Sequence, residues 1–93
     1  MSVFIPPSQT GITIYTKSNC IYCDKVKEIL DGLIVSCDSY LEHDREEFLS
    51  TMKKQIGKEY KTFPMVFMDG TFIGGYEDTL RYLEHKRLFM EEF

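Results

Sequence analysis

Residues 11–40 combine two strand patterns with one helix pattern, and this order restricts the possible folds more than any other feature. In GITIYT (residues 11–16), Ile12 and Ile14 alternate with Thr13 and Tyr15, which is a strand pattern. Residues 21–32 place apolar side chains at helical spacing, with Gly32 as the expected C-terminal stop. LIVSCDSY (residues 33–40) is rich in β-branched and apolar residues. Strands joined by a helix pair in parallel through a right-handed crossover. The segment therefore predicts a β-α-β unit.

The second half of the chain adds a helix, a hairpin and a last helix. Asp44 and Glu47 have the spacing of a capping box, which predicts a helix that ends at Gly57. MVFMDGTFIG (residues 65–74) predicts a β-hairpin, because its central Asp-Gly pair favours a type I′ turn. Residues 76–86 have a helical pattern again. The order β-α-β-α-β-β-α predicts an α/β fold, with a mixed four-stranded sheet flanked by three helices.

The composition narrows the class of protein. Ninety-three residues with 43% hydrophobic content predict one domain over residues 1–93, with residues 1–10 as an N-terminal arm on the surface. The net charge of −4 and the absence of a basic run argue against nucleic acid, and no apolar stretch is long enough for a membrane span. The N-terminus has no positively charged start, so it does not read as a secretory signal. We expect a monomer.

The chain has only three cysteines, whereas a secreted disulfide scaffold of this size usually has a larger, even number. The sequence therefore predicts a reducing, cytoplasmic location. There, a C-x-x-C pair is a redox or metal motif rather than a structural staple.

Cys20 and Cys23 form such a pair at the predicted start of the first helix. Cys20 faces unpaired backbone N–H groups and the positive end of the helix dipole, with Lys17 three residues upstream. This environment lowers the pKa of a cysteine, which is about 8.5 when free, and the thiolate is the nucleophile. Cys23 lies one turn inside on the buried stripe. Cys20 is therefore the expected nucleophile and Cys23 the resolving thiol.

A zinc site is the alternative reading of the pair. It needs about four ligands, and Cys37 and His43 could complete the set with Cys20 and Cys23. Cys37, however, lies within an apolar strand pattern, where a lone cysteine usually packs in the core. A single C-x-x-C next to a β-α-β pattern favours redox chemistry, so no metal is expected.

The residues around the pair resemble the glutaredoxin family of the thioredoxin superfamily. Tyr22, just before Cys23, matches the glutaredoxin C-x-Y-C motif. Thioredoxins instead carry Gly-Pro between their cysteines and a Trp before the first, and this chain has no Trp. TFP (residues 62–64) resembles the T-V-P element of the family, whose proline is cis, and GGYED (residues 74–78) resembles its second glutathione-binding element.

This resemblance implies a thioredoxin-like fold and an enzyme, a glutathione-dependent thiol-disulfide oxidoreductase. It would reduce protein–glutathione mixed disulfides and protein disulfides through Cys20 and Cys23, with glutathione as co-substrate. Its partners would be glutathione and disulfide-containing or glutathionylated proteins. Ribonucleotide reductase is a common client of the family, but nothing in this sequence identifies it. By family position, the glutathione-binding residues are Lys17, Tyr22, Lys61, Thr62, Phe63, Pro64, Gly75, Tyr76, Glu77 and Asp78.

The resemblance also implies roles for these residues. The backbone of Phe63 would pair with the cysteine of glutathione like an added strand. The γ-glutamyl carboxylate would lie on the amides of Glu77 and Asp78 at a helix start. Lys17 and Lys61 are the candidate cations for the glycyl carboxylate; the alternative for each is a solvated surface charge.

Three departures from the family pattern leave questions open. Ile21 stands where the family has Pro, Gly or Ser, which affects the redox poise and argues against a bridged iron–sulfur cluster. Phe63 stands in place of Val, so its ring could alter the groove. Residues 57–62 are about two longer than is common, so no helix residue is assigned to glutathione, with Gln55 and Lys58 as weak candidates. A thioredoxin-like reductase independent of glutathione is the remaining enzyme hypothesis.

Overall fold

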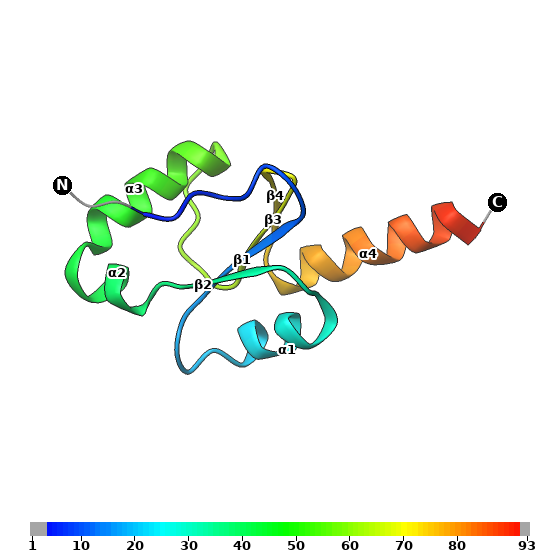
Figure 1. The fold of residues 1–93 in the computed structure, drawn as a ribbon, viewed down its shortest axis with the longest axis horizontal. Coiled ribbons are helices and arrows are strands. Elements are labelled where there is room, and N and C mark those ends of the chain that lie inside the picture. The colour runs from blue at the N-terminus through cyan, green and yellow to red at the C-terminus, as the bar shows by residue number, and fades with distance from the viewer. Residues whose placement is uncertain (1–3, 92–93) are drawn as a thin grey trace.

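The computed structural model describes residues 4–91, with side chains to Lys86, and its backbone forms one mixed sheet covered by helices on both faces (Figure 1). The strands are β1 (Ile12–Thr16), β2 (Leu33–Ser36), β3 (Met65–Met68) and β4 (Thr71–Gly74). The helices are α1 (Ile21–Ile29), α2 (Asp38–His43), α3 (Arg45–Ile56) and α4 (Tyr76–Glu91). The strand order is β2-β1-β3-β4, with β1 and β2 parallel and the other pairs antiparallel. The predicted four-stranded mixed sheet is confirmed.

The alternation in β1 separates two hydrophobic clusters, one on each face of the sheet. Tyr15 packs with residues of α3, among them Phe48 and Met52. Ile14 points to the other face, where it meets Val26 of α1 together with side chains of α4. Consecutive strand residues point to opposite faces, so this one short strand contributes to both clusters. Accordingly, α3 covers one face, and α1 and α4 cover the other (Figure 1).

The predicted hairpin is confirmed, including its turn. Asp69 and Gly70 both have positive φ, 51° and 82°, as a type I′ turn requires. The Asp69 carboxylate accepts a hydrogen bond from the amide of Gly11 at 2.7 Å, and the Asp69 amide donates to the Gly11 carbonyl at 2.8 Å. The turn residue thereby joins the hairpin to the start of β1.

The predicted strand over residues 33–40 is too long, and a fourth helix takes its second half. The ladder of β2 with β1 ends when the Cys37 amide donates to the Thr16 carbonyl at 2.8 Å. Asp38 then begins α2, and the Leu41 amide donates to the Cys37 carbonyl at 2.9 Å. The expected count of three helices is therefore wrong. The N-cap residue of α2 is Cys37, which makes no side-chain cap hydrogen bond, so no capping signal marks this helix start in the sequence.

Two predicted helix ends also differ from the structure. The first helix ends at Ile29, because Leu30 already has extended backbone, and Gly32 does not form a left-handed C-terminal stop. Gly32 is instead needed for space, since a Cβ there would collide with the Ile12 carbonyl. The capping box at Asp44 is also wrong: Asp44 precedes α3, but its side chain forms no cap hydrogen bond. Gly57 does end α3, at φ 91°.

The N-terminal arm is more firmly attached than predicted. Phe4 packs against the cluster on the α3 face, and its ring meets those of Tyr40 and Phe48 edge-on at 4.9 and 5.4 Å. The buried Tyr15 hydroxyl donates to the Ile5 carbonyl at 2.7 Å. The arm therefore contributes a side chain to the core rather than lying only on the surface.

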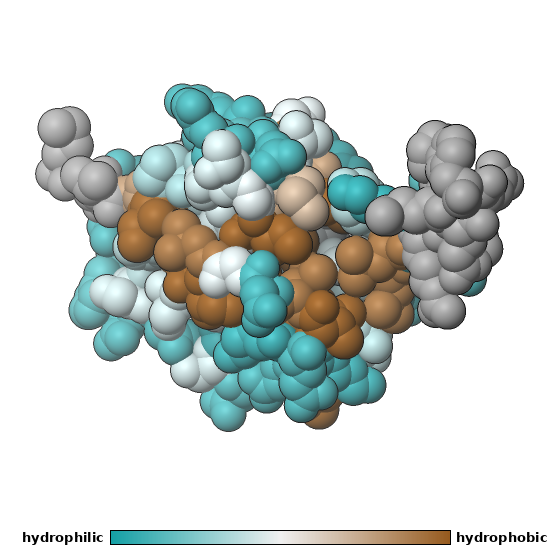
Figure 2. Space-filling model, turned by 45° about the vertical axis from the view of Figure 1, so that its right-hand side comes forward, coloured by the Kyte–Doolittle hydropathy of each residue, from teal (hydrophilic) through white to brown (hydrophobic). Residues whose placement is uncertain are grey.

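Apolar side chains remain on the surface, where they form a band between hydrophilic regions on the face shown in Figure 2. Among the described residues, the large exposed apolar side chains are Ile5, Ile21, Tyr22, Ile29, Leu33, Ile34 and Leu80. Two of these, Ile21 and Tyr22, are neighbours at the start of α1, between the two cysteines. No helix in the described part of the chain is long and apolar enough to cross a membrane.

Candidate active site

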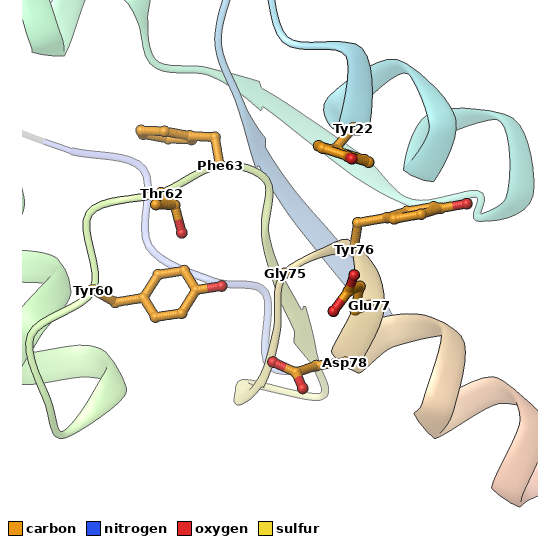
Figure 3. A pocket seen from close by; sticks show the side chains of 8 residues that line it. All are labelled: Tyr22, Tyr60, Thr62, Phe63, Gly75, Tyr76, Glu77 and Asp78. Atoms are coloured by element: carbon orange, nitrogen blue, oxygen red, sulfur yellow. The ribbon is translucent and has the colours of Figure 1, made fainter.

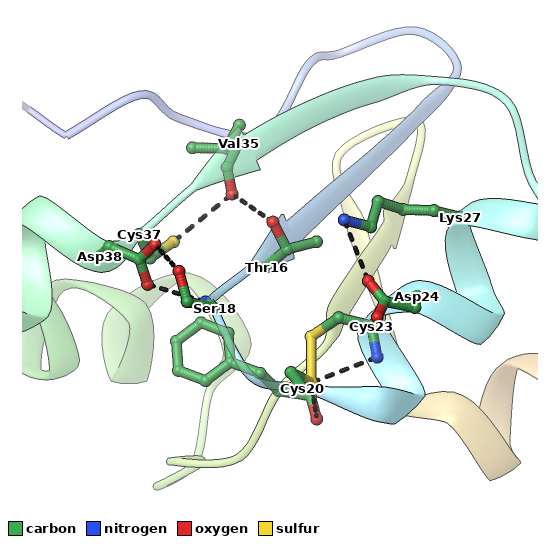
Figure 4. The surroundings of a disulfide bond; sticks show 10 residues. Thr16, Ser18, Cys20, Cys23, Asp24, Lys27, Val35, Cys37 and Asp38 are labelled. Atoms are coloured by element: carbon green, nitrogen blue, oxygen red, sulfur yellow. Dashed lines mark hydrogen bonds and ion pairs between the residues drawn. A yellow bond between two sulfur atoms is a disulfide. The ribbon is translucent and has the colours of Figure 1, made fainter.

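Cys20 and Cys23 form a disulfide at the N-terminus of α1, with Cα atoms 5.2 Å apart (Figure 4). Cys20 is the N-cap residue, and its Sγ accepts a hydrogen bond from the Cys23 amide at 3.2 Å. Cys20 is partly exposed, whereas Cys23 is fully buried. A sulfur that already accepts from a helix N-terminal amide is placed to be stabilised as a thiolate when the disulfide is reduced. The two sulfurs thus differ in their exposure and in their position relative to the helix N-terminus.

The loop before Cys20 is held in place by hydrogen bonds to the start of α2. Asn19 has a positive φ of 56°, uncommon for a residue other than glycine, and it turns the chain from β1 into α1. The Asp38 carboxylate at the start of α2 accepts from the Ser18 amide at 2.8 Å and from the Ser18 hydroxyl (Figure 4). These two hydrogen bonds, followed by the charge of Lys17, lower the pKa of Asp38. A carboxylate thereby fixes the segment that positions the nucleophile.

The backbone around the Phe63–Pro64 bond faces the cysteine pair. This peptide bond is cis, as the resemblance implies, and the Phe63 carbonyl oxygen lies 3.7 Å from the Sγ of Cys20. Pro64 is buried, and the Phe63 ring stacks on Phe48 of α3, with centroids 6.4 Å apart. The Phe63 ring is therefore anchored in the α3 side of the core, and its backbone remains beside the sulfur.

A groove of about 310 Å³ extends from this point to the N-terminus of α4 (Figure 3). Tyr60, Thr62 and Phe63 lie on one side of it; Gly75 and the first turn of α4 lie on the other. Its size is at the lower end of the range for small-molecule sites. The lining residues are Tyr22, Tyr60, Thr62, Phe63, Gly75, Tyr76, Glu77 and Asp78.

Aromatic rings and lysines surround the entrance to the site. Tyr22 and Tyr76 stack with centroids 5.2 Å apart, and Lys25 places its Nζ within 5.5 and 5.7 Å of the two rings. Lys17 lies over the Phe63 ring, with Nζ 5.8 Å from the centroid. At these distances a cation is attracted to the face of a ring. Lys17 and Lys25 therefore place two positive charges beside these rings, in a protein of net charge −4.

The structure brings most of the predicted glutathione-binding residues together. Seven of them line the groove: Tyr22, Thr62, Phe63, Gly75, Tyr76, Glu77 and Asp78. Pro64 is buried behind it. Lys17 and Lys61 do not line the groove, and Lys61 pairs with Glu59 at 3.7 Å. Gln55 and Lys58, the weak helix-side candidates, also lie outside the lining.

Tyr60 is the groove residue that the sequence reading missed. It belongs to the connection between α3 and β3, in which the residues assigned from the family motif begin only at Lys61. The signal that could have revealed it is an aromatic residue in an otherwise polar segment, two positions before Thr62. Lys25, which lies over the Tyr22 and Tyr76 rings, is a second residue beside the site that the sequence did not indicate.

The zinc hypothesis has no geometric support in the described part of the chain. Among these residues, no group of three or more His, Cys, Asp or Glu side chains is arranged to hold a metal ion. Cys37 packs in the cluster on the α3 face, and its Sγ lies 3.7 Å from the Val35 carbonyl. Burial, followed by the neighbouring Asp38 charge, raises the pKa of Cys37 to about 12. Cys37 is a neutral core residue, as predicted.

Comparison with known proteins gives the same picture. The glutaredoxin family model matches residues 12–73. The chain is 32% identical over 83 residues to mitochondrial glutaredoxin-2 of Rattus norvegicus, covering 87% of this chain but only 52% of that protein. It therefore spans about half the length of that relative. Glutaredoxin 1 of Rickettsia bellii is 32% identical over 70 residues, covering 73% of this chain and 71% of that protein.

Solved glutaredoxins share the fold. Glutaredoxin 1 of Francisella tularensis, solved in complex with cacodylate, superposes with a TM-score of 0.68 at 26% identity, covering 84% of this chain and 95% of that one. The buckwheat glutaredoxin–glutathione complex superposes with a TM-score of 0.65 at 22% identity, covering 88% and 76%. The thioredoxin-like fold implied by the resemblance is confirmed. Because the family model matches two thirds of this chain, the chain belongs to the glutaredoxin family.

Proposed function

We propose that this protein is a glutathione-dependent thiol-disulfide oxidoreductase that reduces protein–glutathione mixed disulfides and protein disulfides. The observation that carries the proposal is the position of the Cys20 sulfur. It lies at the N-terminus of α1, 3.7 Å from the Phe63 carbonyl, at one end of a groove that leads to the N-terminus of α4. A nucleophilic thiol and a small-molecule site therefore share one surface.

In the first step, the Cys20 thiolate attacks the glutathionyl sulfur of a protein–glutathione mixed disulfide. A Cys20–glutathione disulfide forms, the original disulfide breaks, and the protein thiolate leaves and takes a proton from solvent. The Cys23 amide and the helix dipole favour the thiolate of Cys20. The thiolate of a second glutathione then attacks the glutathionyl sulfur, releasing oxidised glutathione and restoring the Cys20 thiolate.

The groove has suitable groups to hold glutathione in line for this attack. The backbone beside Phe63 pairs with the cysteine of glutathione in the manner of an added strand. The γ-glutamyl carboxylate lies at the N-terminus of α4, where free amides of Glu77 and Asp78 and the helix dipole favour an anion. The Asp78 carboxylate, which also meets Arg81 at 3.2 Å, accepts from the ligand ammonium.

Lys17 is the better cation for the glycyl carboxylate. Its ammonium group lies over the Phe63 ring, on the Cys20 side of the groove, and makes no ion pair among the described residues. Lys61 is partly neutralised by Glu59 and lines a separate depression beside α3. We therefore assign the contact to Lys17 and treat Lys61 as a solvated charge.

Protein disulfides follow a second route. The Cys20 thiolate attacks one sulfur of the client, and the Cys23 thiolate then attacks the Cys20 sulfur and releases the reduced client. The product is the Cys20–Cys23 disulfide observed in the structure. Two glutathione molecules reduce it again and leave as oxidised glutathione. We propose that the protein works as a monomer. We also propose that it works in the cytoplasm, since a reducing pool of glutathione is required to drive this cycle.

A glutathione-coupled assay on wild type, Cys20→Ser and Cys23→Ser tests the proposal. We expect Cys20→Ser to lose all activity. Cys23→Ser should retain deglutathionylation and lose most reduction of protein disulfides, since only the second route needs a resolving thiol. Turnover of a glutathione mixed disulfide by Cys20→Ser would refute the assignment. Equal turnover when glutathione is replaced by a thioredoxin reductase system would favour a glutathione-independent reductase instead.

A further inference from the structure

Tyr60 projects into the groove from the connection between α3 and β3. Its ring contacts Phe72 of β4 edge-on, with centroids 4.9 Å apart, so its direction is fixed by the sheet. Figure 3 shows the ring between Thr62 and Asp78, with the hydroxyl pointing toward Gly75. The residue is half-buried and lines the groove. Its polar end thus faces the space that a ligand would occupy.

Gly75 makes room for this hydroxyl. A Cβ atom on residue 75 would lie 2.7 Å from the Tyr60 oxygen, closer than real Cβ contacts permit. A glycine opposite a phenol oxygen therefore leaves space that any other residue would fill. No hydrogen bond of this hydroxyl to another described residue is present. The packing with Phe72 needs only a ring, so the hydroxyl has no structural task in that contact.

We propose that the Tyr60 hydroxyl is a specificity-determining group that donates a hydrogen bond to an oxygen of the γ-glutamyl residue of glutathione. The inference rests on the proposed function and extends it to a residue outside the motifs of the sequence. The position supports this assignment, since the Tyr60 hydroxyl points toward the part of the groove that Gly75 and Asp78 line, where the proposed function places the γ-glutamyl residue. The hydroxyl therefore contacts the γ-glutamyl residue of glutathione and not its reacting sulfur.

Tyr60→Phe removes the hydroxyl and keeps the ring. We expect kcat/KM for a glutathione mixed disulfide of a reporter peptide to fall about 3- to 10-fold, as for loss of one neutral hydrogen bond. With the cysteinylglycine mixed disulfide of the same peptide, which lacks the γ-glutamyl residue, the variant should equal wild type. Tyr82→Phe is the matched control, because it removes a phenol hydroxyl from α4 at a position that does not line the groove. It should leave both rates unchanged.

Equal rates for Tyr60→Phe and wild type on the glutathione substrate would overturn the inference. An equal fall on both substrates would also overturn it, because the hydroxyl would then act on the active site in general. If wild type itself does not turn over the glutathione substrate, the proposed function fails first, and the inference fails with it.

A second variant tests the geometry. Gly75→Ala should impair binding of the glutathione substrate in wild type, and it should do so less in a Tyr60→Phe background, where the oxygen that its Cβ meets is gone. Strict additivity of the two changes would argue against the close approach on which the inference depends.

Discussion

Thr79 is buried in α4 without a hydrogen-bond partner for its hydroxyl, which makes it a sensitive position for a stability test. It lies between Tyr76 and Leu83 on the helix face that packs against the α1 side of the sheet. A buried hydroxyl left unpaired costs about 1–3 kcal/mol. Thr79→Val replaces it with a methyl group of similar size and changes helix propensity little. We therefore expect the free energy of unfolding to rise by about 1–2 kcal/mol.

Thr13→Val is the matched control, because Thr13 is equally buried but has a partner. Its Oγ1 accepts a hydrogen bond from the Ser8 amide at 2.9 Å. The same substitution there breaks this bond and leaves the amide unpaired, so the free energy of unfolding should fall by about 0.5–1.5 kcal/mol. Identical chemistry at two buried threonines thus has opposite predicted signs.

Urea and thermal unfolding followed by far-UV circular dichroism measure both changes, with the Cys20–Cys23 pair kept reduced in all samples. In a domain of this size, each kcal/mol corresponds to about 4–8 °C in Tm. A Thr79→Val variant that is less stable than wild type would refute the reasoning, because the hydroxyl would then have a favourable partner. A stabilising Thr13→Val would refute it equally, by showing that the hydrogen bond to the arm contributes nothing.

Three further predictions concern the rest of the molecule. In the reduced, folded protein at neutral pH, iodoacetamide should label Cys20 and spare Cys37, because Cys37 is buried and its pKa is raised to about 12; mass spectrometry checks this. Asp38→Ala should lower stability at neutral pH. Because the pKa of Asp38 is lowered in the folded state, its carboxylate stabilises the fold above the unfolded pKa of about 3.9, and this stabilisation is lost as the pH falls through the folded pKa. Urea unfolding of wild type and Asp38→Ala should therefore give the same free energy of unfolding in acid. Phe4→Ala should lower the free energy of unfolding by about 1–3 kcal/mol, since its half-buried ring contacts two others.

Much of the fold could be predicted from local patterns. The alternation in β1 and the Asp69-Gly70 turn each specify one structure, because a single hydrophobic period or turn type fits them. The start of α2 could not be predicted in this way. It depends on Asp38 reaching Ser18, a partner twenty residues away in the sequence. Gly32 similarly owes its role to Ile12 on a neighbouring strand.

The candidate site divides in the same manner. The roles proposed for Cys20 and Cys23 follow from the physics of a helix start, whereas the groove residues needed the family resemblance because they come from distant segments. Tyr60 was beyond both: it lies in a connection of unusual length, and only packing on Phe72 directs its hydroxyl into the groove. Residues placed by such contacts leave no periodic signal in the sequence.

The departure at Phe63 shows how a side chain can change while its backbone keeps its position beside the Cys20 sulfur. A larger residue than valine at this point could have filled the groove. Instead its ring stacks on Phe48, inclined by only 9°, and Phe48 is in turn packed edge-on by Phe4 of the arm. The extra volume is therefore absorbed by the cluster on the α3 face, while the carbonyl of Phe63 stays 3.7 Å from the Cys20 sulfur. Because an added strand is recognised through main-chain groups, the proposed pairing with glutathione requires no particular side chain here, and the Phe63 ring can pack in the core.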